Sequence, residues 1–335
     1  MKTAKVTLAI IAFLAVMSCK ENKSTDTKTD SVSHNETSDP LPSWTDNDLK
    51  KSIISYVTTV SDSASADYIP SKDRIATFDN DGTLWSEKPL IQGLFLVYQM
   101  EKMLKAKPEL ASKEPFKSFL AKGKEYFTTA SEKEILELFV LTHTGTTEDE
   151  FEASVKEFVA SAKLPKRDVP IKQAIYQPQL ELLQYLRAHG FTIFICTGGT
   201  VEFVRGISQD FYDVPNYRVI GTAFKYEYDE ANNTILRKGE ITHFNDKSGK
   251  PAGIQLSIGQ RPVLACGNEG GAGDIEMLKF CQGSKYKSFQ LLVNHDDAER
   301  EAMYQEKDNA SLNAAGQNKW HVISMKNDWK EIFVK

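Results

Sequence analysis

A short apolar strand that ends in two aspartates constrains the fold of this chain more than any other feature. Residues 74–85 read Arg-Ile-Ala-Thr-Phe-Asp-Asn-Asp-Gly-Thr-Leu-Trp, and the apolar run before Asp79 is typical of a buried strand. Because side chains alternate along a strand, Asp79 and Asp81 should leave its carboxyl end on the same side. Ligands bind at that end of the strands in open parallel sheets. A surface turn can also be rich in Asp and Gly, but the apolar residues on both sides of this one favour a functional site.

The spacing of the two aspartates predicts their chemistry. Two carboxylates a few ångströms apart cannot both ionise easily, so their pKa values are pushed apart. One carboxyl group can then act as a nucleophile while the other keeps a proton that it can donate. The sequence therefore makes Asp79 and Asp81 candidate catalytic residues.

Residues 1–19 have the pattern of a secretory signal. Lys2 and Lys5 precede an apolar run over residues 6–17, and Cys19 follows a small residue. This run is shorter than the ~20 residues that a membrane span needs. A cysteine at the cleavage position resembles a bacterial lipoprotein signal. We therefore expect lipidation of Cys19 and an exported, membrane-anchored protein on the periplasmic or cell-surface side.

Residues 20–42 are polar and charged, contain no aromatic residue and end with two prolines. Such a segment cannot bury enough apolar surface to fold, so we expect a disordered tether before a folded part that begins near Ser43. The formal net charge of the chain is −5, and it has no long basic block, which disfavours nucleic acid as a partner. Cys196 and Cys266 end apolar runs and are expected to be small buried residues.

Strand and helix signals alternate over the rest of the chain. A helical stretch at roughly residues 89–164 follows the aspartates and contains no convincing strand. Beyond it, apolar strands are predicted within residues 191–196, 219–236, 262–266, 289–293 and 320–325. Helical patterns separate most of these strands. This alternation predicts an α/β fold, a doubly wound and mostly parallel sheet with helices on both faces.

Three further strand ends carry polar residues. The strand at residues 191–196 runs into Thr-Gly-Gly-Thr at residues 197–200 before a helix. A hydroxyl and glycine amides at a helix N-terminus can hold a phosphate group, although a helix cap after a glycine turn has the same pattern. Lys250 stands at the start of another helix, where it could neutralise phosphate, and we prefer it to Lys247 in the preceding polar loop. The last strand end leads into the Gly-rich loop of residues 267–274, whose oxygens suit a hard cation.

In this order the motifs resemble the haloacid dehalogenase superfamily of phosphohydrolases, over nearly all of residues 43–335. Residues 79–83 match its first motif, Asp-x-Asp-Gly-Thr. The Thr-Gly-Gly that starts at Thr197 resembles the Ser-Gly-Gly of the phosphoserine-phosphatase-like branch. Lys250 stands at the third motif and the loop of residues 267–274 at the fourth.

The resemblance also implies the domain organisation. The catalytic core would comprise residues 43–85 and 170–335, and residues 86–169 look like the inserted helical cap of many members. In this superfamily the cap contacts the leaving group. Glu87 lies near the place of a substrate-recognising glutamate in phosphoserine-type enzymes, and His143 could reach over the site. Either residue could instead be an ordinary charge or loop histidine.

The mechanism implied by the resemblance is phosphoryl transfer in two steps. Asp79 attacks phosphorus and forms an aspartyl-phosphate. Asp81 protonates the leaving oxygen and then deprotonates the water that hydrolyses the intermediate. Thr197, Gly198 and Lys250 hold the phosphate oxygens.

The resemblance further implies a Mg²⁺ cofactor. It would bind the Asp79 carboxylate, the backbone carbonyl of Asp81 and oxygens of the last loop. Asn268 stands where relatives place a metal aspartate, and Asp274 matches the last aspartate of that motif. Because Mg²⁺ usually needs only one or two carboxylates, we expect Asn268 and Asp274 to complete the site, with Glu269 as a reserve ligand.

We therefore expect a lipid-anchored, Mg²⁺-dependent phosphomonoesterase that acts on a small phosphorylated substrate. Two alternatives stay open. The same site could hydrolyse pyrophosphate or a phosphonate. The chain could also be a catalytically degenerate lipoprotein that binds an anion without turnover, because its fourth motif is longer than usual and contains Asn268.

Overall fold

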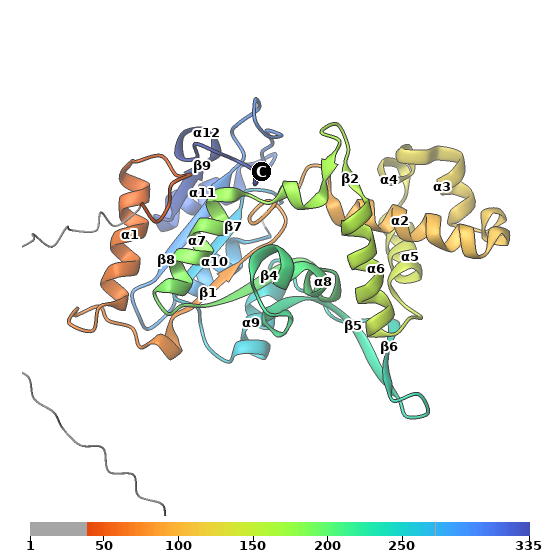
Figure 1. Cartoon of the computed structure of the whole chain (residues 1–335), viewed down its shortest axis with the longest axis horizontal. Coiled ribbons are helices and arrows are strands. Elements are labelled where there is room, and N and C mark those ends of the chain that lie inside the picture. The colour runs from red at the N-terminus through yellow and green to blue at the C-terminus, as the bar shows by residue number, and fades with distance from the viewer. Residues whose placement is uncertain (1–38, 272) are drawn as a thin grey trace, which may run out of the picture. The chain divides into compact units, whose positions relative to one another are not determined.

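The structure is a computed structural model that describes residues 39–335 with the exception of residue 272 (Figure 1). The predicted signal of residues 1–19, its Cys19 and most of the tether at residues 20–42 lie outside the described residues. Each helix that the structure describes is too short or too polar to traverse a bilayer.

The centre of the fold is a seven-stranded sheet with the strand order β6-β5-β4-β1-β7-β8-β9. Its strands are β1 (Ile75–Phe78), β4 (Thr192–Thr200), β5 (Val219–Asp229), β6 (Thr234–His243), β7 (Leu264–Asn268), β8 (Phe289–Asn294) and β9 (His321–Ser324). Only β6 pairs antiparallel within this sheet. The prediction of a mostly parallel α/β sheet is confirmed.

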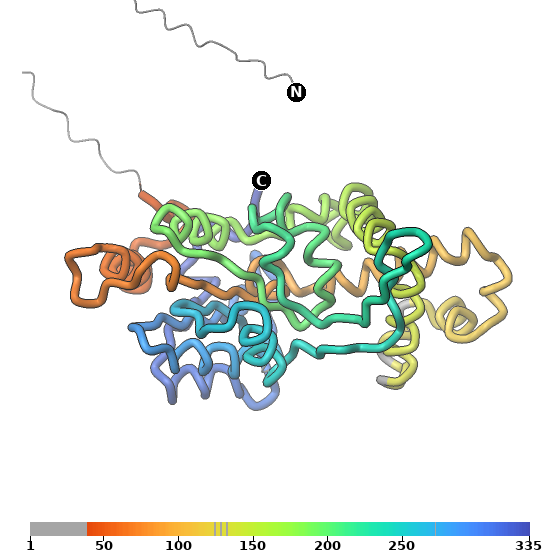
Figure 2. Tube along the Cα trace, turned by 90° about the horizontal axis from the view of Figure 1, so that it is seen from below, coloured from red at the N-terminus to blue at the C-terminus, as the bar shows by residue number. Residues whose placement is uncertain are grey.

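Helices cover both faces of the sheet because its inner strands are apolar on both sides. In β7, Leu264 and Cys266 belong to one core cluster and Ala265 to the other. The first cluster includes residues of α1 (Asp48–Ser61), α7 (Gln177–Ala188) and α8 (Val201–Tyr212), and the second includes residues of α9 (Gly249–Ile258), α10 (Ile275–Gln282) and α11 (Ala310–Asn318). Figure 2 shows helical layers on either side of the strands. Cys196, Cys266 and Cys281 are buried and unpaired.

The chain changes direction across the sheet at β1. Strand β4 pairs with one edge of β1 and β7 with the other, which makes β1 the switch point where ligands bind in doubly wound sheets. The backbone amide of Asp79 donates a hydrogen bond of 2.9 Å to the carbonyl of Cys266. The first aspartate is therefore held directly beyond the carboxyl end of the central strand.

The chain between β1 and β4 is mainly helical. Its elements are α2 (Ile91–Ala106), α3 (Phe116–Lys122), α4 (Tyr126–Thr129), α5 (Glu132–His143), α6 (Glu148–Ser161) and the short pair β2 (Lys163–Leu164) and β3 (Val169–Pro170). Ser131 and Thr147 start α5 and α6 with capping boxes. A small apolar cluster of its own lies within this segment and includes Leu96, Phe116 and Leu138. A last short helix, α12 (Met325–Asp328), lies near the C-terminus.

The β5–β6 hairpin reaches beyond the sheet and contacts the helical segment (Figure 1). Thr147 forms an isolated bridge with Leu236. The amide of Arg237 donates to the carbonyl of Thr146, and the amide of Gly145 donates to that of Arg237. The hairpin is longer than predicted, because β6 continues to His243, which pairs with Ala223 of β5.

Candidate active site

A cavity of about 280 Å³ lies at the carboxyl ends of β1, β4 and β7. It contains most of the side chains that the sequence nominated for the site. The predicted residues that line it are Asp79, Asp81, Glu87, Gly198, Lys250, Asn268 and Asp274. Residues from four separate strand or helix ends are thus brought together at one edge of the sheet.

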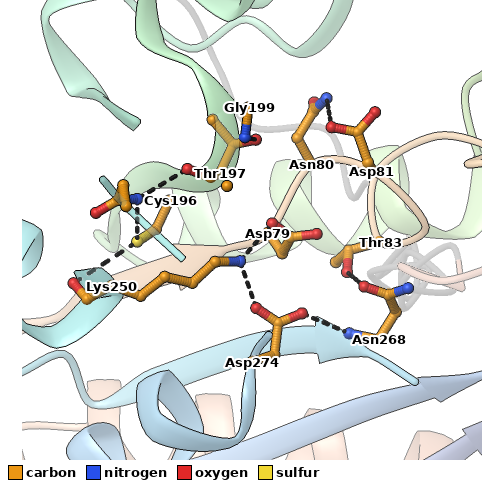
Figure 3. A network of polar contacts seen from close by, with 12 residues as sticks. Asp79, Asn80, Asp81, Thr83, Cys196, Thr197, Gly199, Lys250, Asn268 and Asp274 are labelled. Atoms are coloured by element: carbon orange, nitrogen blue, oxygen red, sulfur yellow. Dashed lines mark hydrogen bonds and ion pairs between the residues drawn. The ribbon is translucent and has the colours of Figure 1, made fainter. Parts of the chain in front are cut away.

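Asp79, Lys250 and Asp274 form a buried charge cluster (Figure 3). The Nζ atom of Lys250 lies 2.6 Å from Oδ1 of Asp79 and 2.5 Å from Oδ1 of Asp274. Lys250 is at the first turn of α9, as expected, whereas Lys247 is exposed in the turn before it. Only Lys250 of these two lysines therefore lies in the cavity.

The charge cluster is short of positive charge, because two carboxylates share one ammonium group. Burial and repulsion from Asp274 raise the pKa of Asp79 well above its ordinary value, although Lys250 partly offsets both effects. Burial opposes the charge on Lys250, but the attraction of Asp274 and Asp79 raises its pKa above the ordinary value. Lys250 therefore stays positively charged. A second cation would stabilise the two carboxylates beside it.

Asp81 has a different environment, made of neutral hydrogen-bond donors. Its Oδ1 accepts a hydrogen bond of 3.0 Å from Nε1 of Trp85, and its Oδ2 accepts one of 2.9 Å from Nε2 of Gln92. A longer contact comes from Nδ2 of Asn80. Burial raises the pKa of Asp81, and these hydrogen bonds oppose the increase. Such a carboxyl group is suited to hold a proton and to release it during a reaction.

A tight turn at Gly82 connects the two aspartates to the rest of the site. Gly82 has a φ of +81°, and its amide donates to the carbonyl of Trp85. A Cβ atom at this position would lie 2.2 Å from Nδ2 of Asn268. The backbone conformation and the contact with Asn268 both require glycine here.

The segment after β4 differs from the predicted turn. Strand β4 continues through Thr200 after a register shift against β5. Side chains from other elements hold this segment: Thr222 donates to the carbonyl of Gly198 and Asn245 to that of Thr197. Gly198 lines the cavity, whereas Thr197 is fully buried beside it. The hydroxyl oxygen of Thr197 accepts the amide of Gly199 and keeps its own proton free to donate.

Three residues of this site have no signal in the sequence. Gln92, near the start of α2, donates to Asp81 and accepts the amide of Thr200 through Oε1. Trp85 donates to Asp81, and the fully buried Asn245 holds Thr197. Their roles depend on contacts between distant segments, which no local pattern reveals.

The loop after β7 has one carboxylate in the cavity and one turned away. Asp274 accepts the backbone amide of Asn268 at 3.0 Å through its second oxygen. Glu269 is fully buried, but its Oε1 accepts the backbone amide of Glu306 in a different segment. The placement favours Asn268 and Asp274 over Glu269 as oxygen donors toward Asp79.

These residues fit a Mg²⁺ ion. Within residues 39–335 without residue 272, no group of three or more His, Cys, Asp or Glu side chains forms a metal cluster. The cavity nevertheless offers two carboxylates, on Asp79 and Asp274, and the amide of Asn268. Mg²⁺ needs only one or two carboxylates and takes its other ligands from water and phosphate. The raised pKa of Asp79 also indicates a site that an additional cation would stabilise.

The two predicted substrate residues have different positions. Glu87 lines the cavity, with Oε1 3.6 Å from Nζ of Lys88. His143 is fully buried, does not line the cavity and stacks on Phe139 with ring centroids 4.0 Å apart. Its Nδ1 contacts the hydroxyl of Thr142, and burial together with nearby Arg237 lowers its pKa to about 3. The predicted reach of His143 over the site is therefore wrong, because the end of α5 packs into an aromatic cluster.

Comparisons with known proteins agree with this fold. The model of the family described as haloacid dehalogenase-like hydrolase matches residues 76–279. A functionally unknown protein from Anaerococcus prevotii DSM 20548 is 12% identical, with 84% of this chain and 94% of that chain covered and a TM-score of 0.51. A protein of unknown function from Bordetella pertussis Tohama I is 14% identical, with 75% and 98% covered and a TM-score of 0.48.

A phosphoserine phosphohydrolase-like protein from Francisella tularensis subsp. tularensis SCHU S4 is also similar. It is 15% identical, with 75% of this chain and 94% of that chain covered and a TM-score of 0.38. No curated protein matches the chain. At 12% identity the Anaerococcus prevotii structure supports the fold alone.

Proposed function

The chain belongs to the haloacid dehalogenase-like hydrolase family, and on that basis we propose that it is a phosphatase that hydrolyses phosphate monoesters. One observation carries the proposal. Two carboxyl groups lie at the end of the central strand in different environments. Asp79 is beside a buried ammonium group, and Asp81 is among neutral hydrogen-bond donors. This is the division of roles that a nucleophile and a proton donor need.

In the first step Asp79 attacks phosphorus. The ammonium of Lys250, 2.6 Å from Oδ1, favours the ionised form that can act as a nucleophile. As the new bond from Asp79 to phosphorus forms, the bond from phosphorus to the alcohol oxygen breaks, and Asp81 donates its proton to that oxygen. The products are an aspartyl-phosphate and the free alcohol.

In the second step a water molecule attacks the phosphorus of the aspartyl-phosphate. Asp81, now a carboxylate, accepts a proton from the water, and the bond between phosphorus and Asp79 breaks to release phosphate. Lys250, the amide of Gly198 and the hydroxyl of Thr197 would stabilise charge on the phosphoryl oxygens in both steps.

We propose Mg²⁺ as the cofactor of this site. The groups that would hold it are the carboxylates of Asp79 and Asp274, the amide oxygen of Asn268 and the backbone carbonyl of Asp81. When bound, Mg²⁺ supplies positive charge to the phosphoryl oxygens. The shortage of positive charge around Asp79 supports this assignment.

Hydrolysis of p-nitrophenyl phosphate by the purified protein, with and without Mg²⁺, tests the proposal. Asp79→Asn should abolish turnover because an amide cannot attack phosphorus. Asp81→Asn should reduce the rate by ~100- to 10,000-fold, the usual contribution of a general acid or base. Asp73→Asn is a matched control, since Asp73 precedes the opposite end of β1. Near-native activity of Asp79→Asn would overturn the nucleophile assignment, and phosphate binding without turnover by the native protein would favour the degenerate alternative.

We also propose that the protein is an exported lipoprotein, anchored in a membrane through Cys19. The signal-like residues 1–19 and the polar residues that follow support this proposal. The native protein should fractionate with membranes and carry lipid on Cys19, and Cys19→Ala should release it or leave it uncleaved without changing its intrinsic activity. A native protein found in the soluble fraction with an unmodified Cys19 would contradict the proposal.

A further inference from the structure

We propose that the leaving group of the substrate is an apolar alcohol that carries no negative charge. This inference rests on the proposed phosphatase function and specifies its substrate class. It excludes phosphorylated acids and pyrophosphate, in which the leaving group is an anion. The inference follows from the charges that line the cavity and from the apolar surface that continues out of it.

Lys250 is the only cation among the described residues that line the cavity. It is 2% exposed, and its ammonium group already contacts Asp79 and Asp274. None of the described side chains that line the cavity therefore offers a free positive charge to a second acidic group of the substrate. Phosphate is accommodated by Lys250 and the proposed Mg²⁺, but an additional anion is not.

Two more carboxylates, on Asp246 and Glu87, line the cavity. A Cβ atom at Gly273 would lie 2.8 Å from Oδ1 of Asp246, and one at Gly198 would lie 3.5 Å from it. Glu87 stands nearer the loop after β7, because a Cβ atom at Gly270 would lie 3.1 Å from its Oε2. Lys88 is close to Glu87 but lines a neighbouring cavity instead. An anionic leaving group would thus be repelled by Asp246 and Glu87.

Part of the cavity wall is apolar. Leu90, which is 54% exposed, and Phe139 line it. Phe139 also lines an open groove of about 390 Å³, together with the apolar side chains of Phe127, Ala130, Ile135 and Leu136. Because Phe139 lines both the cavity and the groove, the apolar surface continues from the reacting groups along α4 and α5. An apolar leaving group would cover this surface once its phosphate is in the cavity.

Two pairs of esters test the two parts of the inference on the native protein. Hexyl and ethyl phosphate share a primary alcohol and differ in apolar length, and we expect kcat/KM to be at least about tenfold higher for hexyl phosphate. Phenyl phosphate and its 4-carboxymethyl derivative differ in one negative charge, and we expect kcat/KM to be about tenfold lower for the charged ester at low ionic strength. The 4-aminomethyl derivative controls for the size of the substituent and should be a better substrate than the carboxymethyl ester, because Asp246 and Glu87 attract its charge.

Variants assign these preferences to residues. Phe139→Ala should reduce the ratio of kcat/KM between hexyl and ethyl phosphate. Leu141→Ala is its matched control, because Leu141 is an exposed residue of α5 that lines neither the cavity nor the groove. Combining Asp246→Asn with Glu87→Gln should raise kcat/KM for the carboxymethyl ester more than for phenyl phosphate.

The outcomes separate this inference from the proposed function. Equal kcat/KM for all esters, or a preference for the carboxymethyl ester, would overturn the inference and leave the phosphatase function intact. If the native protein hydrolyses none of the esters with Mg²⁺ present, the proposed function fails and the inference is overturned with it. The ratios are measured on the native protein, so they do not depend on whether a variant folds.

Discussion

Lys250→Met removes the ammonium group from the buried charge cluster and keeps a side chain of similar length. Asp79 and Asp274 would then stay buried without the lysine they share. Removing one partner of a buried ion pair typically costs about 3–5 kcal/mol. In a large domain, each 1 kcal/mol lost from the free energy of unfolding lowers the melting temperature by roughly 2–4 °C. The melting temperature of the variant should therefore fall by about 6–20 °C.

The destabilisation of Lys250→Met should depend on pH. Burial and Asp274 raise the pKa of Asp79, and Lys250 lowers it, so the variant should have an even higher pKa at Asp79. A carboxyl group whose folded pKa lies above its unfolded pKa stabilises the fold at low pH and loses that contribution as the pH rises through the folded value. The variant should therefore be closest to the native protein in acid, and the difference in melting temperature should widen toward neutral pH.

Thermal unfolding at pH 5 and pH 8 measures both effects. The double variant Lys250→Met with Asp79→Asn should recover part of the lost stability at pH 8, because it removes one of the two unpaired carboxylates. Lys247→Met, an exposed change in the same loop, is the matched control and should leave the melting temperature unchanged. An equal loss of stability at both pH values, without recovery in the double variant, would refute the description of this site as a charge cluster with a shared cation.

Two further changes test the positions of other side chains. Gln92→Ala should slow the hydrolysis of alkyl phosphates more than that of p-nitrophenyl phosphate. Asp81 loses a hydrogen-bond donor that orients it, and the poor leaving groups of alkyl phosphates depend most on the proton of Asp81. An equal effect on both esters would contradict this role of Gln92. Asp274→Ala should raise the Mg²⁺ concentration needed for half-maximal activity sharply, and Glu269→Ala should raise it less, because Glu269 is turned toward another segment. Titrations that give the reverse order would show that Glu269 is the metal ligand.

The residues at strand ends were predictable because their neighbours carry a strong local signal. Asp79 follows an apolar strand, and Lys250 stands where a helix with several apolar residues begins. In a parallel sheet the carboxyl ends of the strands lie at one edge, so the order of the motifs along the chain was enough to bring these side chains into one cavity. The fold class followed from the same alternation of strands and helices.

The contacts that orient these residues could not be predicted. Gln92 orients Asp81 because the start of α2 lies against Asp81 and Thr200. This position of α2 depends on how the helical segment packs on the core. The environment of His143 has the same origin, since His143 stacks on Phe139, which in turn stacks on Phe224 of β5. Helical periodicity indicates that one face of α5 is apolar, but not which segment that face meets.

The amide at position 268, where relatives have an aspartate, is explained by its contacts. Nδ2 of Asn268 donates to the carbonyl of Glu269 at 3.2 Å, and the Thr83 hydroxyl lies 3.4 Å from its Oδ1. A carboxylate in this position would have no proton to donate to that carbonyl. It would also add a third negative charge beside Asp79 and Asp274, which already share one lysine. An amide keeps an oxygen available to a cation without this repulsion, so Asn268 alone is no sign of a site that has lost its chemistry.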